Sequence, residues 1–251
     1  MEDVKVKSLY RALKLLDYFT IEVPQRGITE LAELSGMLKS TVHNVVSTFQ
    51  KCGFLEQNSD NNKYRLGMKI LELNNNLYMT NDLRNTVHPF LMNIANFSNE
   101  CVYFGIPSEN EVVYLDAVYS NGNLSGRSIV GIKAPLYCTG VGKAIMAYSK
   151  PEVVDEVIGA GLKAFTQNTI TDKNKLLEEI DLIKIRNFAI DNMEHEYGIK
   201  CVSVPVKNIR GNIVGSISIS GPSLRFSDDK ISEYAKYLME ISNQLKVLIQ
   251  R

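Results

Sequence analysis

The sequence predicts an α+β protein in two parts: a helical N-terminal domain and a C-terminal antiparallel sheet with helices packed on it. Apolar residues recur at helical spacing through residues 4 to 50. Segments rich in β-branched and aromatic residues, separated by turn formers, dominate between Cys101 and Ser220. The order of helices and strands there is not that of a doubly wound nucleotide-binding sheet. At 251 residues the chain is long enough for two cores.

The first helix is expected over residues 4–20, where an apolar stripe should complete a three-helix core. Its members are Leu9, Tyr10, Leu13 and Leu16. A second helix should begin near Ile28 with Thr29 as its capping residue, and Gly36 should end it because glycine tolerates the left-handed conformation of a helix C-terminus.

A third helix, opened by Ser40 and Thr41, should run to Gly53 and leave a polar face outward. Two apolar segments, Phe54–Leu55 and Tyr64–Leu66, flank a polar loop of turn formers and predict a two-stranded wing. A helix-turn-helix followed by a wing is typical of DNA-binding proteins. The alternative is a helical hairpin with a purely structural role.

Hydroxyl, amide and basic side chains are the ones that reach phosphates and base edges. The candidate DNA-contacting residues are Arg11, Thr29, Lys39, Ser40, Thr41, His43, Asn44, Ser47, Lys63 and Arg65. The 28 basic residues balance the 28 acidic ones, so any affinity for DNA must come from local placement of charge. Affinity per monomer would then be modest, which favours a dimer.

Three divisions of the chain are expected: a winged domain over residues 1–67, a linker helix over 68–82 and a second domain over 83–251. Within the second domain Asp82 can begin a helix, in which Pro89 predicts a kink or break. Asn74–Asn76 read as a helix boundary, since asparagine is a poor helix former. Strands are expected over residues 101–106, 112–119, 189–193, 200–207 and 212–220, with a further strand or ordered loop over 124–132. Helices should cover residues 143–148, 173–186 and a C-terminal stretch from Ser227.

Polar residues of this second domain should converge on a pocket. Ser216, Ser218 and Ser220 alternate with apolar residues, so their hydroxyls lie on one face of a strand. Asp191 and Cys201 fall on neighbouring strands, and the loop around Gly140 leaves backbone amides open. Such a pocket suits a small carboxylate or keto acid, although a solvent-facing strand would show the same alternation.

Two other chemistries fit some of the same residues. Cys201 could act as a nucleophile with His195 as its base, in a small-molecule enzyme fused to a helical domain. Cys138, Asp191, His195 and Cys201 would also suit zinc, but their spacing is not that of a metal site. Residues 137–143 lack the glycine and hydroxyl pattern of a P-loop. We therefore expect neither catalysis nor a metal or other cofactor.

The four cysteines, 45% hydrophobic and 22% charged residues are ordinary for a soluble intracellular protein. The cysteines are far apart and form no CxxC pair, which favours reduced thiols. The sequence shows no signal peptide, and its apolar runs are too short to span a bilayer. A cytoplasmic protein without a membrane partner is expected.

Eleven ordered motifs run along nearly the whole chain: SLYRAL at residues 8–13, ELAE at 30–33, KSTVH at 39–43, YRLG at 64–67, EVVYL at 111–115, APL at 134–136, GVGKA at 140–144, NTITD at 168–172, GIKC at 198–201, VPV at 204–206 and ISISGP at 217–222. Together they resemble the motifs of the IclR family of bacterial transcriptional regulators.

The resemblance implies a winged helix-turn-helix, a linker helix and a GAF/profilin-like effector-binding domain. Members of this family dimerise through their N-terminal domains, often pair into tetramers and bind a promoter palindrome. A small metabolite, commonly a carbon-source acid, changes their assembly or their affinity for DNA. We expect a repressor here, with an activator as the alternative. The implied effector contacts are Gly140, Val141, Asp191, Ile199, Cys201, Ser218 and Ser220. Asn44 stands where an arginine is usual, and Met193 where an acidic residue is usual.

Overall fold

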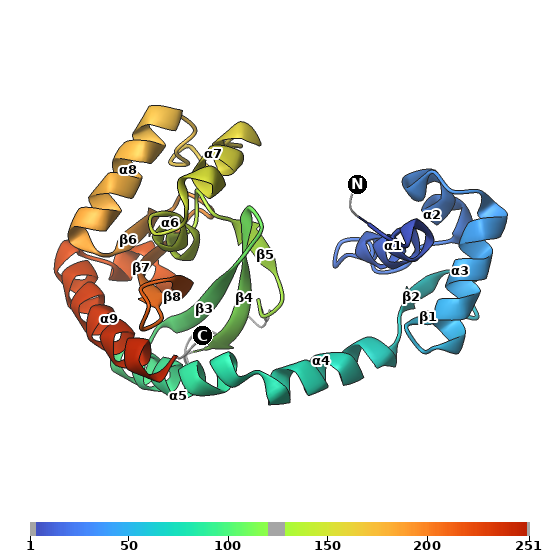
Figure 1. Ribbon diagram of the computed structural model, residues 1–251, viewed down its shortest axis with the longest axis horizontal. Coiled ribbons are helices and arrows are strands. Elements are labelled where there is room, and N and C mark those ends of the chain that lie inside the picture. Colours follow the sequence, from blue (N-terminus) through green and yellow to red (C-terminus); the bar gives the residue numbers. More distant parts are fainter. Residues whose placement is uncertain (1–3, 120–128, 250–251) are drawn as a thin grey trace. The chain divides into compact units, whose positions relative to one another are not determined.

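The computed structural model describes residues 4–119 and 129–249, which form two compact units, Met1–Asn81 and Asp82–Arg251 (Figure 1). The first unit contains the helix-turn-helix and its wing, followed by one long helix. The second contains the curved antiparallel sheet and its covering helices. The predicted α+β class is therefore confirmed, and each unit is described separately.

The N-terminal unit begins with helix α1 (Lys7–Lys14), the 3₁₀ helix η1 (Leu15–Tyr18), α2 (Ile28–Ser35) and α3 (Lys39–Lys51). Strands β1 (Leu55–Gln57) and β2 (Tyr64–Leu66) pair in an antiparallel wing, and α4 (Met68–Thr80) follows. The core joins η1, α2 and α3 to the wing through Leu15, Phe19, Leu31, Ala32, Val42, Val46, Leu55 and Tyr64.

The first helix differs from its prediction, because the stripe expected in the core faces outward. Leu9 is 56% exposed and Leu13 is 49% exposed. The chain tightens from α-helix to 3₁₀ helix at Leu15, which changes the direction of the following side chains, so Leu15 and Phe19 are buried instead. An apolar surface on α1 is thus left uncovered within the unit.

The turn between α2 and α3 is formed as expected, but the start of α2 is not. Gly36 has a φ of +66° and ends α2 in the left-handed conformation. Thr29 was the wrong cap: the N-cap is Gly27, whose backbone N–H donates to the Glu30 carboxylate at 2.7 Å. The asparagines at 74–76 do not mark a boundary, since α4 runs continuously through them and all its residues are exposed or half-buried.

The C-terminal unit opens with α5 (Asp82–Ser98), β3 (Cys101–Ser108), β4 (Glu111–Val118) and β5 (Lys133–Pro135). Helices α6 (Gly140–Met146), α7 (Pro151–Gly159) and α8 (Lys173–Arg186) follow. The chain then forms β6 (Ala189–Asn192), β7 (Ile199–Lys207), β8 (Ile213–Pro222), η2 (Ser223–Arg225) and α9 (Asp228–Leu248).

These strands form an antiparallel sheet in the order β5-β4-β3-β8-β7-β6, with helices on both faces (Figure 1). Helices α5 and α9 pack on one face through residues such as Leu91 and Leu238, which meet Val202 and Ile219 of the central strands. Helices α6, α7 and α8 form a second core. Burying each large aliphatic side chain contributes about 1.5–3 kcal/mol, so the two cores fix the sheet between two helical layers.

Two local expectations for this unit need correction. Helix α5 runs through Pro89 without a break, because Pro89 lies on its exposed side while Val87 and Leu91 hold the helix on the sheet. Helix α6 begins at Gly140, three residues early, since the Thr139 hydroxyl caps it by accepting the Gly142 N–H at 3.1 Å. Of the strand or ordered loop expected over 124–132, residues 124–128 lie outside the described residues, and 129–132 form a loop and turn rather than a strand.

Candidate functional site

Helix α3 presents a polar surface to solvent. Val42 and Val46 are fully buried against the rest of the unit, so the opposite side of the helix points outward. That side carries five exposed candidates, Lys39, Ser40, Thr41, His43 and Asn44, with Ser47 half-buried beside them. Helix α3 is the second helix of the helix-turn-helix, and polar residues exposed on this helix can contact a DNA groove.

The basic residues of the wing are engaged in ion pairs. Lys63 Nζ lies 3.0 Å from the Glu30 carboxylate, and the Arg65 guanidinium lies 3.1 Å from Glu56. Exposed pairs of this kind contribute about 0–1 kcal/mol, so phosphate groups can replace the carboxylates at little cost. The other two candidates, Arg11 on α1 and Thr29 on α2, are exposed.

The C-terminal unit holds a cavity of about 680 Å³ between the sheet, α6 and the segment after β6. All seven residues expected to contact an effector line it: Gly140, Val141, Asp191, Ile199, Cys201, Ser218 and Ser220. Cys201 of β7 and Ser220 of β8 face each other across the two strands. The cavity volume is within the range of small-molecule sites.

Close packing of α6 on the sheet forms one wall of this cavity. A Cβ added at Gly140 would lie 2.5 Å from the Ser203 hydroxyl oxygen and 3.3 Å from the Cys201 Cβ. Only glycine therefore allows the start of α6 to approach β7 so closely. The Gly142 and Lys143 amides are bonded to Thr139, whereas Gly140 and Val141 lie at the cavity.

Asp191 is a buried acidic residue of the cavity lining, with only 4% of its surface exposed. Its carboxylate accepts the backbone N–H of Glu194 at 2.8 Å. Burial nevertheless raises the pKa of Asp191 to about 7, so roughly half of these carboxyls are protonated at neutral pH. A protonated Asp191 can donate a hydrogen bond to an anionic ligand rather than repel it.

A buried ion network lies behind Asp191. The Lys143 ammonium is 1% exposed and is hydrogen-bonded to the Glu194 carboxylate at 2.5 Å, with Glu179 at 3.3 Å. Glu179 is also bonded to Arg186 at 2.7 Å. Burial raises the pKa of Glu194, while the Lys143 charge opposes that shift. Because Lys143 is engaged by these two carboxylates, its charge only partly offsets the burial of Asp191.

The enzyme alternative finds little support in this geometry. The Cys201 thiol donates to the Ser220 hydroxyl at 3.2 Å, and burial raises the thiol pKa, which disfavours the nucleophilic thiolate. The His195 ring packs against Phe165 at 5.0 Å between centroids, and burial lowers its pKa. Among the described residues no cluster of three His, Cys, Asp or Glu side chains is placed to hold a metal, so the zinc alternative lacks a ligand set.

Sequence reasoning missed the aromatic side of the cavity. Tyr103, Tyr114 and Tyr119 line it, and the rings of Tyr103 and Tyr114 lie 5.7 Å apart. Burial raises the pKa of Tyr103 and of Tyr114, so both hydroxyls stay neutral. Tyr103 lies directly opposite Ser218 in the β3–β8 register, a pairing that no local pattern reveals. Lys133, His195 and Glu196 also lie on the lining.

The exposed α3 with its wing and the cavity of the C-terminal unit together define a class of protein. In this class, which includes the ligand-responsive transcription regulators, a winged DNA-binding unit is joined to a ligand-binding unit. Comparison with protein families agrees. Residues 8–59 match the IclR helix-turn-helix domain, and residues 77–247 match the bacterial transcriptional regulator IclR C-terminal domain. The chain belongs to the IclR family of transcriptional regulators.

Named relatives include two regulators of Escherichia coli. The HTH-type transcriptional regulator KdgR is 32% identical over 84% of this chain and 81% of its own length. The transcriptional repressor IclR is 28% identical over 96% of this chain and 89% of its own length. An IclR homolog from Microbacterium hydrocarbonoxydans, crystallised with 4-hydroxybenzoate, superposes with a TM-score of 0.80. It covers 95% of this chain and 97% of its own at 22% identity, which indicates a common fold.

No helix in the part of the chain that the structure describes is both long and apolar enough to cross a membrane.

Proposed function

We propose that this protein is a repressor that binds an operator palindrome as a dimer and is controlled by a small organic acid. The observation that carries the proposal is the presence in one chain of an exposed polar face on α3 and of a cavity lined by polar and aromatic side chains in the second unit. The E. coli relative named a repressor supports the direction of control. The homolog crystallised with 4-hydroxybenzoate supports a carboxylate as the class of ligand.

DNA recognition is assigned to α3 and the wing. Ser40, Thr41 and Asn44 would contact base edges and phosphates, while Lys63 and Arg65 would exchange their carboxylates for the backbone on either side. The exposed apolar surface of α1 supports a second copy of the chain as its cover, because Leu9 and Leu13 are about half exposed in the single chain. A dimer would double the phosphate contacts, and two dimers would form a tetramer.

Effector recognition is assigned to the cavity around Asp191. A carboxylate would meet the start of α6 at Gly140 and the hydroxyls of Ser218 and Ser220, with Ile199 as an apolar wall. Asp191 would bind in its protonated form, which its raised pKa allows near neutral pH. The ligand controls repression only if it binds one arrangement of the dimer more tightly than another. In this proposal the acid binds and dissociates without chemical change, so the protein catalyses no reaction. The protein acts in the cytoplasm, where its operator DNA lies.

A gel-shift assay with the promoter duplex next to the coding region tests the DNA-binding part. The purified chain should retard the duplex at low salt, and the double variant Ser40→Ala, Thr41→Ala should bind at least tenfold more weakly, since two contacts worth about 1 kcal/mol each are lost. Ser232→Ala is the matched control, because this exposed hydroxyl lies on α9 and donates to the Asp228 carbonyl. Equal retardation by all three proteins would place the recognition surface elsewhere.

A thermal-shift screen of keto acids, sugar acids and aromatic acids tests the effector part. A ligand at a hundred times its dissociation constant should stabilise the protein by about 2.7 kcal/mol. The stabilisation should be lost in Asp191→Ala, and the same acid should change the gel shift of the unmodified protein. An acid that stabilises Asp191→Ala equally well binds outside this cavity.

A further inference from the structure

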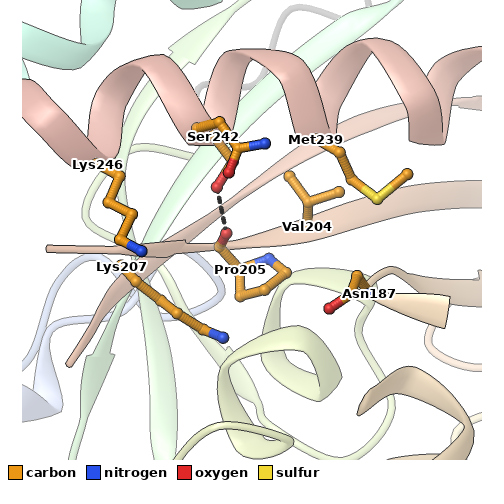
Figure 2. Close-up of a pocket in the computed structure, with 8 residues that line it drawn as sticks. Asn187, Val204, Pro205, Lys207, Met239, Ser242 and Lys246 are labelled. Atoms are coloured by element: carbon orange, nitrogen blue, oxygen red, sulfur yellow. Dashed lines mark hydrogen bonds between the residues drawn. The ribbon is translucent and has the colours of Figure 1, made fainter. Parts of the chain in front are cut away.

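A second cavity, of about 340 Å³, lies at the edge of the sheet between β7 and α9 (Figure 2). Figure 2 shows Lys246 and Ser242 projecting from α9 toward β7, where Pro205 and Lys207 lie. Asn187, at the C-terminal end of α8, completes the lining on the opposite side. These residues are separate from those that line the cavity around Asp191.

The cavity exists because β6 is shorter than β7. Their pairing ends at Ala189, opposite Ser203, so the following residues of β7 have no strand beside them on that side. Pro205 suits such an edge since it has no N–H to leave unpaired. Its carbonyl oxygen accepts the Ser242 hydroxyl at 2.6 Å, which ties α9 to the edge. The floor of the cavity is therefore a fixed surface with its polar groups satisfied.

The charged side chains that line this cavity are both positive. They are Lys207 and Lys246, and no acidic side chain is among the described lining residues. Lys207 Nζ lies 3.3 Å from the centroid of the Tyr148 ring, and the Tyr148 hydroxyl donates to Asn187 at 3.0 Å. Burial and then the nearby Lys246 lower the pKa of Lys207, as expected for two cations that face one cavity.

We propose that this cavity binds a phosphate group, either as inorganic phosphate or as part of a small phosphorylated metabolite. Lysine ammonium groups bind phosphate as point charges, and two lysines line this cavity, Lys246 from α9 and Lys207 from β7, with no acidic side chain among the described lining residues. The side-chain amide of Asn243 also lines the site and supplies a neutral donor. The volume is at the low end for ligand sites, so the occupant has few atoms beyond the phosphate. A concave site of this size fits a small molecule better than a duplex backbone.

Isothermal titration calorimetry on the full chain tests this proposal, with inorganic phosphate and glycerol 3-phosphate as probes at matched ionic strength. Lys246→Gln and Lys207→Gln should each weaken binding by about tenfold or more, since each removes a charge-assisted contact. Lys246 is exposed, so its substitution leaves the fold intact even if Lys207→Gln disturbs the contact with Tyr148. Lys236→Gln is the matched control, because Lys236 is an exposed lysine of the same helix outside the cavity.

Tighter binding of glycerol 3-phosphate than of phosphate would support a phosphorylated metabolite as the ligand, and equal affinity would support phosphate itself. The proposal is overturned if neither probe binds, if both cavity variants bind as the unmodified protein does, or if Lys236→Gln causes the same loss. It is also overturned if Lys246→Gln weakens binding of the promoter duplex, since that result would assign the lysines to DNA. Failure of operator binding or of the organic-acid screen would leave these outcomes unaffected.

Discussion

Replacing Asp191 by asparagine should remove a pH-dependent part of the protein's stability. The pKa of Asp191 is raised from 3.8 to about 7 by burial, so the folded state holds this proton more tightly than the unfolded state does. The contribution of Asp191 to stability is therefore most favourable at low pH and falls as the pH rises toward 7, where the buried carboxylate must become charged. Three pKa units correspond to about 4 kcal/mol once the group is fully ionised.

Urea unfolding at several pH values measures this effect. Between about pH 5 and about pH 8 the unmodified protein should lose about 2.5 kcal/mol more unfolding free energy than Asp191→Asn, whose amide does not ionise. The other titrating groups are common to both proteins and cancel in the difference. The chain has no tryptophan, so circular dichroism or tyrosine fluorescence is the signal. The two units can unfold separately, and the effect belongs to the transition of the C-terminal unit.

Parallel stability curves for the two proteins across this pH range would refute the reasoning. They would mean that Asp191 is already ionised at pH 5 and that a carboxylate ligand would meet a negative charge. In that case the assignment of a protonated Asp191 to ligand binding would also fail.

Three further predictions concern packing, buried charge and assembly. Gly140→Ala should destabilise the C-terminal unit by about 1–3 kcal/mol and weaken effector binding, because the new methyl group meets Ser203. Urea unfolding measures the loss of stability and calorimetry measures the loss of binding. A variant as stable as the unmodified protein would show that α6 can shift freely. Lys143→Met should lower the free energy of unfolding by about 3–5 kcal/mol, since it leaves Glu194 buried without its cation. A decrease below about 1 kcal/mol in urea unfolding would contradict this prediction. If the proposed dimer forms through α1, Leu9→Asp should convert it to monomers in sedimentation analysis at unchanged helix content. A dimer that persists in this variant would show that α1 is not its interface.

The parts of the fold set by local chemistry were predictable from the sequence. Helices α8 and α9 begin where the sequence predicts, because the side-chain oxygens of Asp172 and Ser227 at their N-caps each accept a nearby backbone N–H. Gly36 ends α2 in the left-handed conformation that glycine tolerates. The polar face of α3 followed from the spacing of Val42 and Val46.

Features that depend on long-range packing were not predictable. The outward direction of Leu9 and Leu13 depends on the switch to a 3₁₀ helix at Leu15, and helical periodicity alone does not show it. Pro89 is tolerated because the buried side of α5 is anchored on the sheet. Tyr103 enters the effector cavity through the register of β3 on β8, which is known only once the strands are paired.

The candidate effector residues came from two sources. Alternation along β8 placed Ser218 and Ser220 on one face, whereas Val141 and Ile199 followed only from the resemblance to the IclR family. Ser203 was missed because nothing local shows that Gly140 packs against it.

The short helix α6 has a consequence for how signals combine. Its first residues, Gly140 and Val141, form a wall of one cavity, and Tyr148, just beyond its last turn, touches Lys207 at the other. All seven of its residues are buried, so one packed element borders both cavities. Ligands that favour different positions of α6 would alter each other's affinity by the same factor. The organic acid and the phosphate proposed above would then act on DNA binding together rather than independently.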